Sequence, residues 1–144
     1  MKLQRNVSRA ALRAGAVVML QEVRSRIPVA SGDLSRSARI TTRARGTNVS
    51  ASVKVGNAVA WYAHLVEFGT RQHRISAKPG HAMRFAGVTV HSVLHPGTRA
   101  QPFMRPAAGA GFAEAVRAVG NKYRERLTNA GLNAPAPIPM DPET

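Results

Sequence analysis

Two stretches decide the fold, Val66-Glu67-Phe68-Gly69-Thr70-Arg71 and Pro96-Gly97-Thr98-Arg99-Ala100-Gln101-Pro102-Phe103-Met104-Arg105-Pro106. They share a Gly-Thr-Arg step, which can turn sharply because glycine adopts positive φ without steric cost and threonine can bond to the local backbone. The second stretch runs into Pro-Phe-Met-Arg-Pro, where two prolines flank a large apolar pair and set the start of a following helix. We expect two anchored turns that the rest of the chain connects.

Long helices are predicted towards both ends of the chain. Apolar residues recur at helical spacing over about 3–26, and Pro28 ends that helix. A last helix is predicted over about 107–129, with Gly131 as its stop. The arginines of the first helix fit either a solvated helix face or a surface that reads nucleic acid.

Strands are predicted between these helices. Residues 39–45 and 49–55 alternate in polarity around a turn at 46–48, and further strand is predicted over 73–94 with a hairpin tip at 86–87. The expected fold class is α+β, with a long N-terminal helix and a C-terminal helix packed on an antiparallel sheet of about four strands. Residues 1–131 are expected to form a single domain, and the Pro-rich residues 132–144 an extended arm.

A short helix is predicted between the hairpins, because Trp61, Leu65 and Phe68 lie at i, i+4 and i+7 before the Gly69 turn. Glu67, on this segment, is the only acidic residue between Asp33 and Glu114. In so basic a chain we expect it to pair with an arginine, within the subunit or across an interface. A general base would need a partner acid or nucleophile nearby.

The chain of 144 residues is strongly basic, with 21 Lys and Arg against seven acids and a formal charge of +14. Such a field favours contact with nucleic acid, an acidic protein surface or anionic lipid. The sharpest basic patch is one face of the first predicted hairpin, which presents Arg39, Arg43, Arg45 and Lys54. These four residues are candidates to face DNA or line a channel, or they form a solvated sheet face.

Several function classes are disfavoured by composition. The absence of cysteine excludes disulfides and thiolate sites, and no apolar stretch reaches the roughly 20 residues of a membrane span, which predicts a cytosolic-type soluble protein. Scattered acids argue against an enzyme such as a nuclease. Four histidines fall within 73–95 and raise a metal hypothesis, but they lack ligand spacing and an accompanying carboxylate. We predict no metal, no cofactor and no catalytic residue.

Three segments resemble one known family in the right order. They are P-x-x-S-G-D-L at 28–34 with Ser37, Tyr62-Ala63 leading into V-E-F-G-T, and H-P-G-T-R-A-Q-P-F-M-R-P-A at 95–107. Together they are similar to the tail-component family of long-tailed phages, whose members act as tail-completion or neck proteins and to which minor tail protein Z is related. The segment between Gly69 and Pro96 is longer than in compact members, and the Pro-rich tail lies outside the pattern.

The resemblance implies a structural virion protein that forms a homohexameric ring at the head-to-tail junction, with double-stranded DNA passing through its lumen without sequence specificity. Implied partners are further copies, head-closure or connector proteins, and a tail terminator or tail tube protein, with no membrane. The implied location is the virion, and the host cytoplasm during assembly. A tail terminator ring capping the tube is one alternative, and a free basic nucleic-acid-binding protein is another.

The two opening stretches supply the expected contacts between subunits or with partners. Glu67 and Arg105 are expected to fix the loops at that interface. The candidates are Glu67, Phe68, Gly69, Thr70, Arg71, Pro102, Phe103, Met104 and Arg105.

Overall fold

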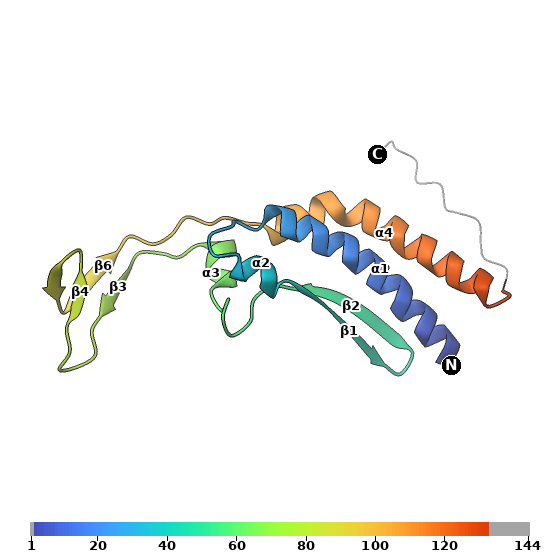
Figure 1. Ribbon diagram of the computed structural model, residues 1–144, viewed down its shortest axis with the longest axis horizontal. Coiled ribbons are helices and arrows are strands. Elements are labelled where there is room, and N and C mark those ends of the chain that lie inside the picture. The colour runs from blue at the N-terminus through green and yellow to red at the C-terminus, as the bar shows by residue number, and fades with distance from the viewer. Residues whose placement is uncertain (1, 133–144) are drawn as a thin grey trace.

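In the computed structural model, which describes residues 2–132, two long antiparallel helices form one end of the molecule and a narrow β-arm forms the other (Figure 1). The helices are α1 (Lys2–Arg26) and α4 (Met104–Asn129), which pack against each other along their length. Both were predicted, and α4 begins at Met104 rather than at 107. Among the described residues, no helix is both long and apolar enough to span a membrane.

Small residues let α1 and α4 approach closely. A Cβ atom on Gly15 of α1 would lie 2.5 Å from Cγ2 of Val119 and 2.8 Å from the carbonyl oxygen of Ala115. On α4, Gly111 is buried against the side chains of Glu22 and Met19 of α1. The buried side chains of these two helices are small, among them Val7, Ala11, Ala16, Ala107 and Ala115.

The first hairpin covers the other side of α1. Strands β1 (Arg39–Arg45) and β2 (Asn48–Lys54) pair antiparallel, with Ile40 opposite Val53 and Ala44 opposite Val49. These apolar residues are half-buried, and both strands pack on α1. Alternation of side chains along a strand puts the polar positions on the opposite, exposed face.

Two short helices connect the hairpin to the rest of the body. They are α2 (Asp33–Ser37) and α3 (Ala63–Phe68), which lie near the C-terminal end of α1 (Figure 1). The main core cluster lies here, and its largest fully buried side chains are Phe103 and Val23, each 1% exposed. The cluster consists of Val23, Ile27, Leu34, Ala38, Ala60, Ala63, Phe103 and Ala107.

The chain between the two Gly-Thr-Arg steps leaves the body as the arm (Figure 1). Within it β3 (His73–Ser76) pairs with β6 (Ser92–His95), and β4 (Met83–Phe85) pairs with β5 (Val88–Val90). The tip turns at Ala86 and Gly87, with φ of 50° and 83°, as predicted. The main contacts of the arm strands are with one another rather than with the body.

The α+β class is confirmed, but the strands do not form one sheet of about four. Among the described residues six strands form three separate two-stranded sheets, because the arm projects away from the body and cannot extend the β1–β2 pair. The predicted apolar face of the short helix also differs from expectation, and Trp61 precedes α3. Trp61 and Phe68 are 64% and 70% exposed, and α3 buries Ala63 and Glu67 instead.

The domain boundary at 131 stays a prediction. Residues 133–144, which make up nearly all of the C-terminal segment predicted to be extended, lie outside the described residues.

Candidate functional site

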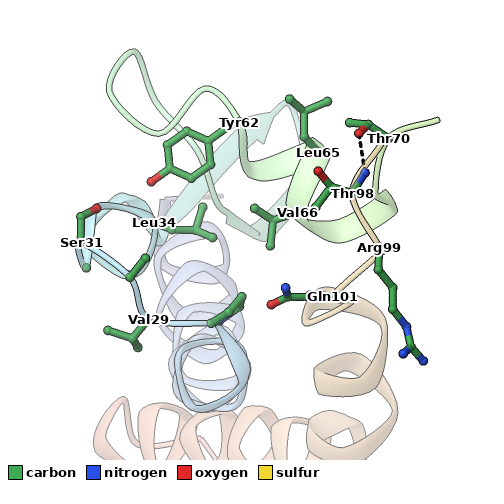
Figure 2. Close-up of a pocket in the computed structure, with 13 residues that line it drawn as sticks. Val29, Ser31, Leu34, Tyr62, Leu65, Val66, Thr70, Thr98, Arg99 and Gln101 are labelled. Carbon is green, nitrogen blue, oxygen red and sulfur yellow. Dashed lines mark hydrogen bonds between the residues drawn. The ribbon is translucent and has the colours of Figure 1, made fainter. Parts of the chain in front are cut away.

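The two Gly-Thr-Arg steps pair with each other and close the base of the arm. The Thr70 amide donates to the Thr98 carbonyl at 2.9 Å, and the Thr98 amide donates to the Thr70 carbonyl at 3.1 Å. The Thr98 amide also lies 2.9 Å from Oγ1 of Thr70 (Figure 2). Two segments that are separate turns in the sequence are thus joined by an isolated antiparallel bridge.

Glycine is required on both sides of this junction. Gly69 has φ 71° and ψ −178°, a region that only glycine adopts readily. A Cβ there would lie 2.5 Å from the Thr98 carbonyl oxygen and 2.7 Å from the Ala100 nitrogen. Gly97 has φ 91°, and its Cβ would overlap the Thr70 carbonyl oxygen. The two backbones approach too closely to admit a side chain at either position.

Glu67 holds the start of α4. Its Oε2 accepts hydrogen bonds from the amides of Phe103 at 2.7 Å and Met104 at 3.0 Å, and its Oε1 accepts one from the amide of Arg105 at 3.3 Å. The first amides of a helix have no partner within the helix, and a carboxylate also complements the positive end of the helix dipole. Glu67 on α3 is therefore the N-terminal cap of a helix that begins 37 residues later.

The expected arginine partner of Glu67 is replaced by this set of backbone donors. None of the ion pairs among the described residues includes Glu67. Burial raises the pKa of Glu67, but the hydrogen bonds from the Met104, Phe103 and Arg105 amides and the charge of Arg105 outweigh that effect. The net result is a pKa below the ordinary value of a glutamate, so the side chain is a charged cap at neutral pH.

A cavity of about 460 Å³ lies beside this junction (Figure 2). It is lined from three places in the chain, namely residues 28–34 before and in α2, residues 62–70 around α3, and residues 98–101 after the arm. These are the three segments that carry the family resemblance. Sequence reasoning did not predict the cavity, because nothing local indicates that segments so far apart meet.

Ser37 links the first of these segments to the loop that follows β2. This side chain is 3% exposed, and its Oγ donates to the Leu34 carbonyl at 2.6 Å while accepting from the Gly56 amide at 2.9 Å. The loop after β2 contains another pair of hydrogen bonds that the sequence did not predict. The side-chain oxygen of Asn57 accepts from the amides of Val59 and Ala60, which is the local turn that asparagine often forms.

The residues predicted to form the subunit interface fall into buried, half-buried and exposed groups. Glu67 and Phe103 are buried inside the subunit, at 8% and 1% exposed, so their contacts are with their own chain. Gly69, Thr70 and Met104 are half-buried. The members that present a free surface are Phe68, Arg71, Pro102 and Arg105.

The predicted basic face of the hairpin lies on one exposed surface. Arg39 and Lys54 are directly opposite in the register, and Arg43 and Arg45 follow at alternate positions of β1. Arg39 is also a structural tie, since its guanidinium donates to the carbonyls of Ser37 and Gly56. The ion pairs found among the described residues do not include Arg43, Arg45 or Lys54.

The histidines of the arm do not assemble a ligand set. His73 and His95 are cross-strand partners whose ring centroids lie 5.1 Å apart. In the part of the chain that the structure describes, no group of three His, Cys, Asp or Glu side chains gathers at a distance that could hold a metal.

The N-terminal part of the chain, up to this junction, is similar to a family of phage tail components. The model of the HK97-gp10-like family, described as "Bacteriophage HK97-gp10, putative tail-component", matches residues 2–69. The match confirms the predicted family, and it supports a structural role in the tail and contacts with other virion proteins. It spans α1, α2, the first hairpin and α3, and ends at the Gly69 turn. Neither a curated protein nor a solved structure matches the chain.

Proposed function

We propose that the chain forms a closed ring of six copies at the head-to-tail junction of a tailed phage, joining the head connector to the tail tube. The match to a tail-component family carries this proposal. The chain acts there as a structural protein and not as an enzyme. It assembles in the host cytoplasm and stays in the virion.

Exposed apolar side chains support self-association. On the arm, Ile75, Val88 and Leu94 are 41%, 61% and 57% exposed, and at its base Phe68 is 70% exposed. A two-stranded ribbon is marginally stable in water unless it packs on another surface. The arm gains such a surface when it lies on the body of the next copy.

The asymmetry of the molecule favours a ring over a two-fold dimer. A closed ring needs two different patches on each copy, one that binds the preceding copy and one that binds the next. The arm and the surface around Phe68, Arg71, Pro102 and Arg105 are two such patches. A ring of this kind, placed on either the head side or the tube side, leaves a lumen for DNA.

The ring is tested with Phe68→Asp in the full chain. Because Phe68 is exposed in the single subunit, folding is expected to be unchanged, whereas a carboxylate buried at an interface costs about 3 kcal/mol or more and weakens association by about 100-fold. The measurement is electron microscopy of assembled tails, combined with sedimentation of the purified chain.

The matched control is Phe112→Asp, which changes an aromatic residue of α4 that is 67% exposed and lies outside the proposed interface. It is expected to leave assembly intact. Density for the native chain that shows no ring at the junction would refute the proposal. A ring that caps the tube on its own, with no connector bound, would favour the tail terminator alternative.

We also propose that the basic face of the hairpin contacts the DNA that passes through the ring. Arg43, Arg45 and Lys54 are exposed, and the hairpin contains no acidic residue. Contacts of arginine and lysine with phosphate do not depend on sequence and weaken as salt rises.

The double variant Arg43→Glu/Arg45→Glu is expected to lower DNA affinity and to reduce the slope of log affinity against log salt by about 2. The control is Arg117→Glu, an exposed arginine of α4 that pairs with Glu114. DNA affinity is measured by fluorescence anisotropy on random-sequence duplexes. If both variants lower affinity equally, the hairpin has no special role, and tight binding by a monomer would favour a free nucleic-acid-binding protein.

A further inference from the structure

The cavity beside the arm base has the size and lining of a peptide site. Its volume of about 460 Å³ lies within the range of about 300–1,000 Å³ that is typical of ligand sites. Leu34, Leu65 and Val66 supply apolar side chains, and the ring of Tyr62 lies beside them (Figure 2). Arg99 extends from the rim, and none of the ion pairs among the described residues includes it. This combination suits an extended segment with apolar side chains followed by a carboxylate.

Residues 133–144 of the chain have the complementary chemistry. Their sequence is Asn-Ala-Pro-Ala-Pro-Ile-Pro-Met-Asp-Pro-Glu-Thr, so Ile138 and Met140 are followed by Asp141 and Glu143. This tail holds two of the seven acids and none of the 21 Lys and Arg, whereas the rest of the chain is basic. Proline-rich segments favour an extended helix that loses little entropy on binding, and they bind in aromatic-lined grooves.

The tail is too short to bind in the cavity of its own subunit. The cavity lies at the N-terminal end of α4, and the tail leaves the C-terminal end, where the Leu132 amide bonds to the Leu127 carbonyl. From Leu127 back to Met104 the helix is about 35 Å long at ~1.5 Å per residue. Eight residues separate Leu132 from Met140, which fully extended span at most about 29 Å.

We propose that residues 138–141 of one copy bind in this cavity of a neighbouring copy. Ile138 and Met140 lie against the apolar lining, and Asp141, with Glu143 after it, pairs with Arg99 at the rim. Each copy then donates one tail and accepts another, which is a head-to-tail linkage of the kind that closes into a ring. This linkage does not depend on the proposed location at the head-to-tail junction, because it requires only that copies of the chain associate.

Disulfide trapping tests the linkage in the full chain, which has no native cysteine. Val29→Cys places a thiol at the cavity on a residue that is 78% exposed, so folding is expected to be unaffected. It is mixed with a mass-tagged chain carrying Ile138→Cys and oxidised mildly. The mixed disulfide is expected to form at least about fivefold more than with Ala113→Cys, an exposed position of α4 that serves as the control.

A chain that carries both Val29→Cys and Ile138→Cys identifies the direction of binding. Linked oligomers support binding between copies, whereas an internally closed monomer would show that the tail occupies its own cavity and would overturn the proposal. Equal yields at Val29 and Ala113, or no mixed disulfide at all, would overturn it too.

The charge contact is tested separately by swapping charges. Arg99→Asp in the cavity chain is expected to lower the trapping yield several-fold, and Asp141→Arg with Glu143→Arg in the tail chain is expected to restore it. No effect of Arg99→Asp would refute the pairing of the tail carboxylates with Arg99. Failure of both the swap and the trapping, in a chain that still forms rings, would refute the tail linkage and leave the ring proposal standing.

Discussion

Gly97→Ala is expected to lower the free energy of unfolding of the arm base by about 4 kcal/mol. Part of this cost is the strain of holding alanine at the observed φ of 91°, about 1–3 kcal/mol, and part is the overlap of its Cβ with the Thr70 carbonyl. The overlap is with backbone, and the Thr70 and Thr98 hydrogen bonds must lengthen to relieve it. Gly69→Ala is expected to act in the same direction, because its Cβ would meet the opposite strand at Thr98.

Gly80→Ala is the matched control within the arm. Gly80 also has a positive φ, 78°, but a Cβ there would have no neighbour within 4 Å. Its cost is therefore conformational strain alone, about 1 kcal/mol. Hydrogen exchange of the Thr98 and Gln101 amides reports opening of the base, and chemical denaturation reports the global effect. Equal costs at positions 97 and 80 would show that the close approach of the strands does not matter.

Glu67→Ala is expected to lower the free energy of unfolding by about 3 kcal/mol. The substitution removes a helix cap, which costs about 0.5–2 kcal/mol, and leaves the buried Phe103 amide without its partner, which costs about 1–3 kcal/mol. Glu67→Gln keeps an acceptor oxygen and is expected to lose only about 1 kcal/mol. Both are measured by denaturant unfolding at neutral pH.

The pH dependence of stability separates the contribution of the Glu67 charge from that of its hydrogen-bonding shape. The pKa of Glu67 is lower in the folded state than in the unfolded state, so ionisation stabilises the fold above the ordinary glutamate pKa of about 4.3. That stabilisation is lost as the pH falls through the lower, folded-state value. The difference in stability between the native chain and Glu67→Gln is therefore constant from pH 7 to about 5 and shrinks below about 4.3.

Glu125→Ala is the control for the cap, since Glu125 is an exposed carboxylate whose contact is with Lys122 on the same helix. No measurable loss of stability is expected from it. If Glu67→Ala were as mild as Glu125→Ala, the three amide contacts would have no role in holding α4.

The elements themselves followed from the sequence. Helical periodicity and Pro28 predicted α1, and the alternation of polar and apolar residues predicted the first hairpin and its basic face. Ala86 and Gly87 predicted the tip of the arm. The order of the three motif segments was enough to predict the family that residues 2–69 match. These are local patterns, and each depends on residues only a few positions apart.

Pairing between distant segments was decided by the tertiary structure. The sequence presented two similar Gly-Thr-Arg turns, but only the fold pairs Thr70 with Thr98 and so turns the chain between them into an arm instead of extra strands of one sheet.

The partners of Glu67 were decided in the same way. A carboxylate in a basic chain is expected to pair with an arginine. Instead, three backbone amides at the N-terminal end of α4 donate hydrogen bonds to Glu67, and no sequence pattern indicates that they are its neighbours. Local sequence patterns were enough to predict which elements form and which of them are basic. Only long-range packing determined which of them meet, because periodicity and turn residues act locally, whereas the cavity at the junction joins residues as far apart in the sequence as Pro28 and Gln101.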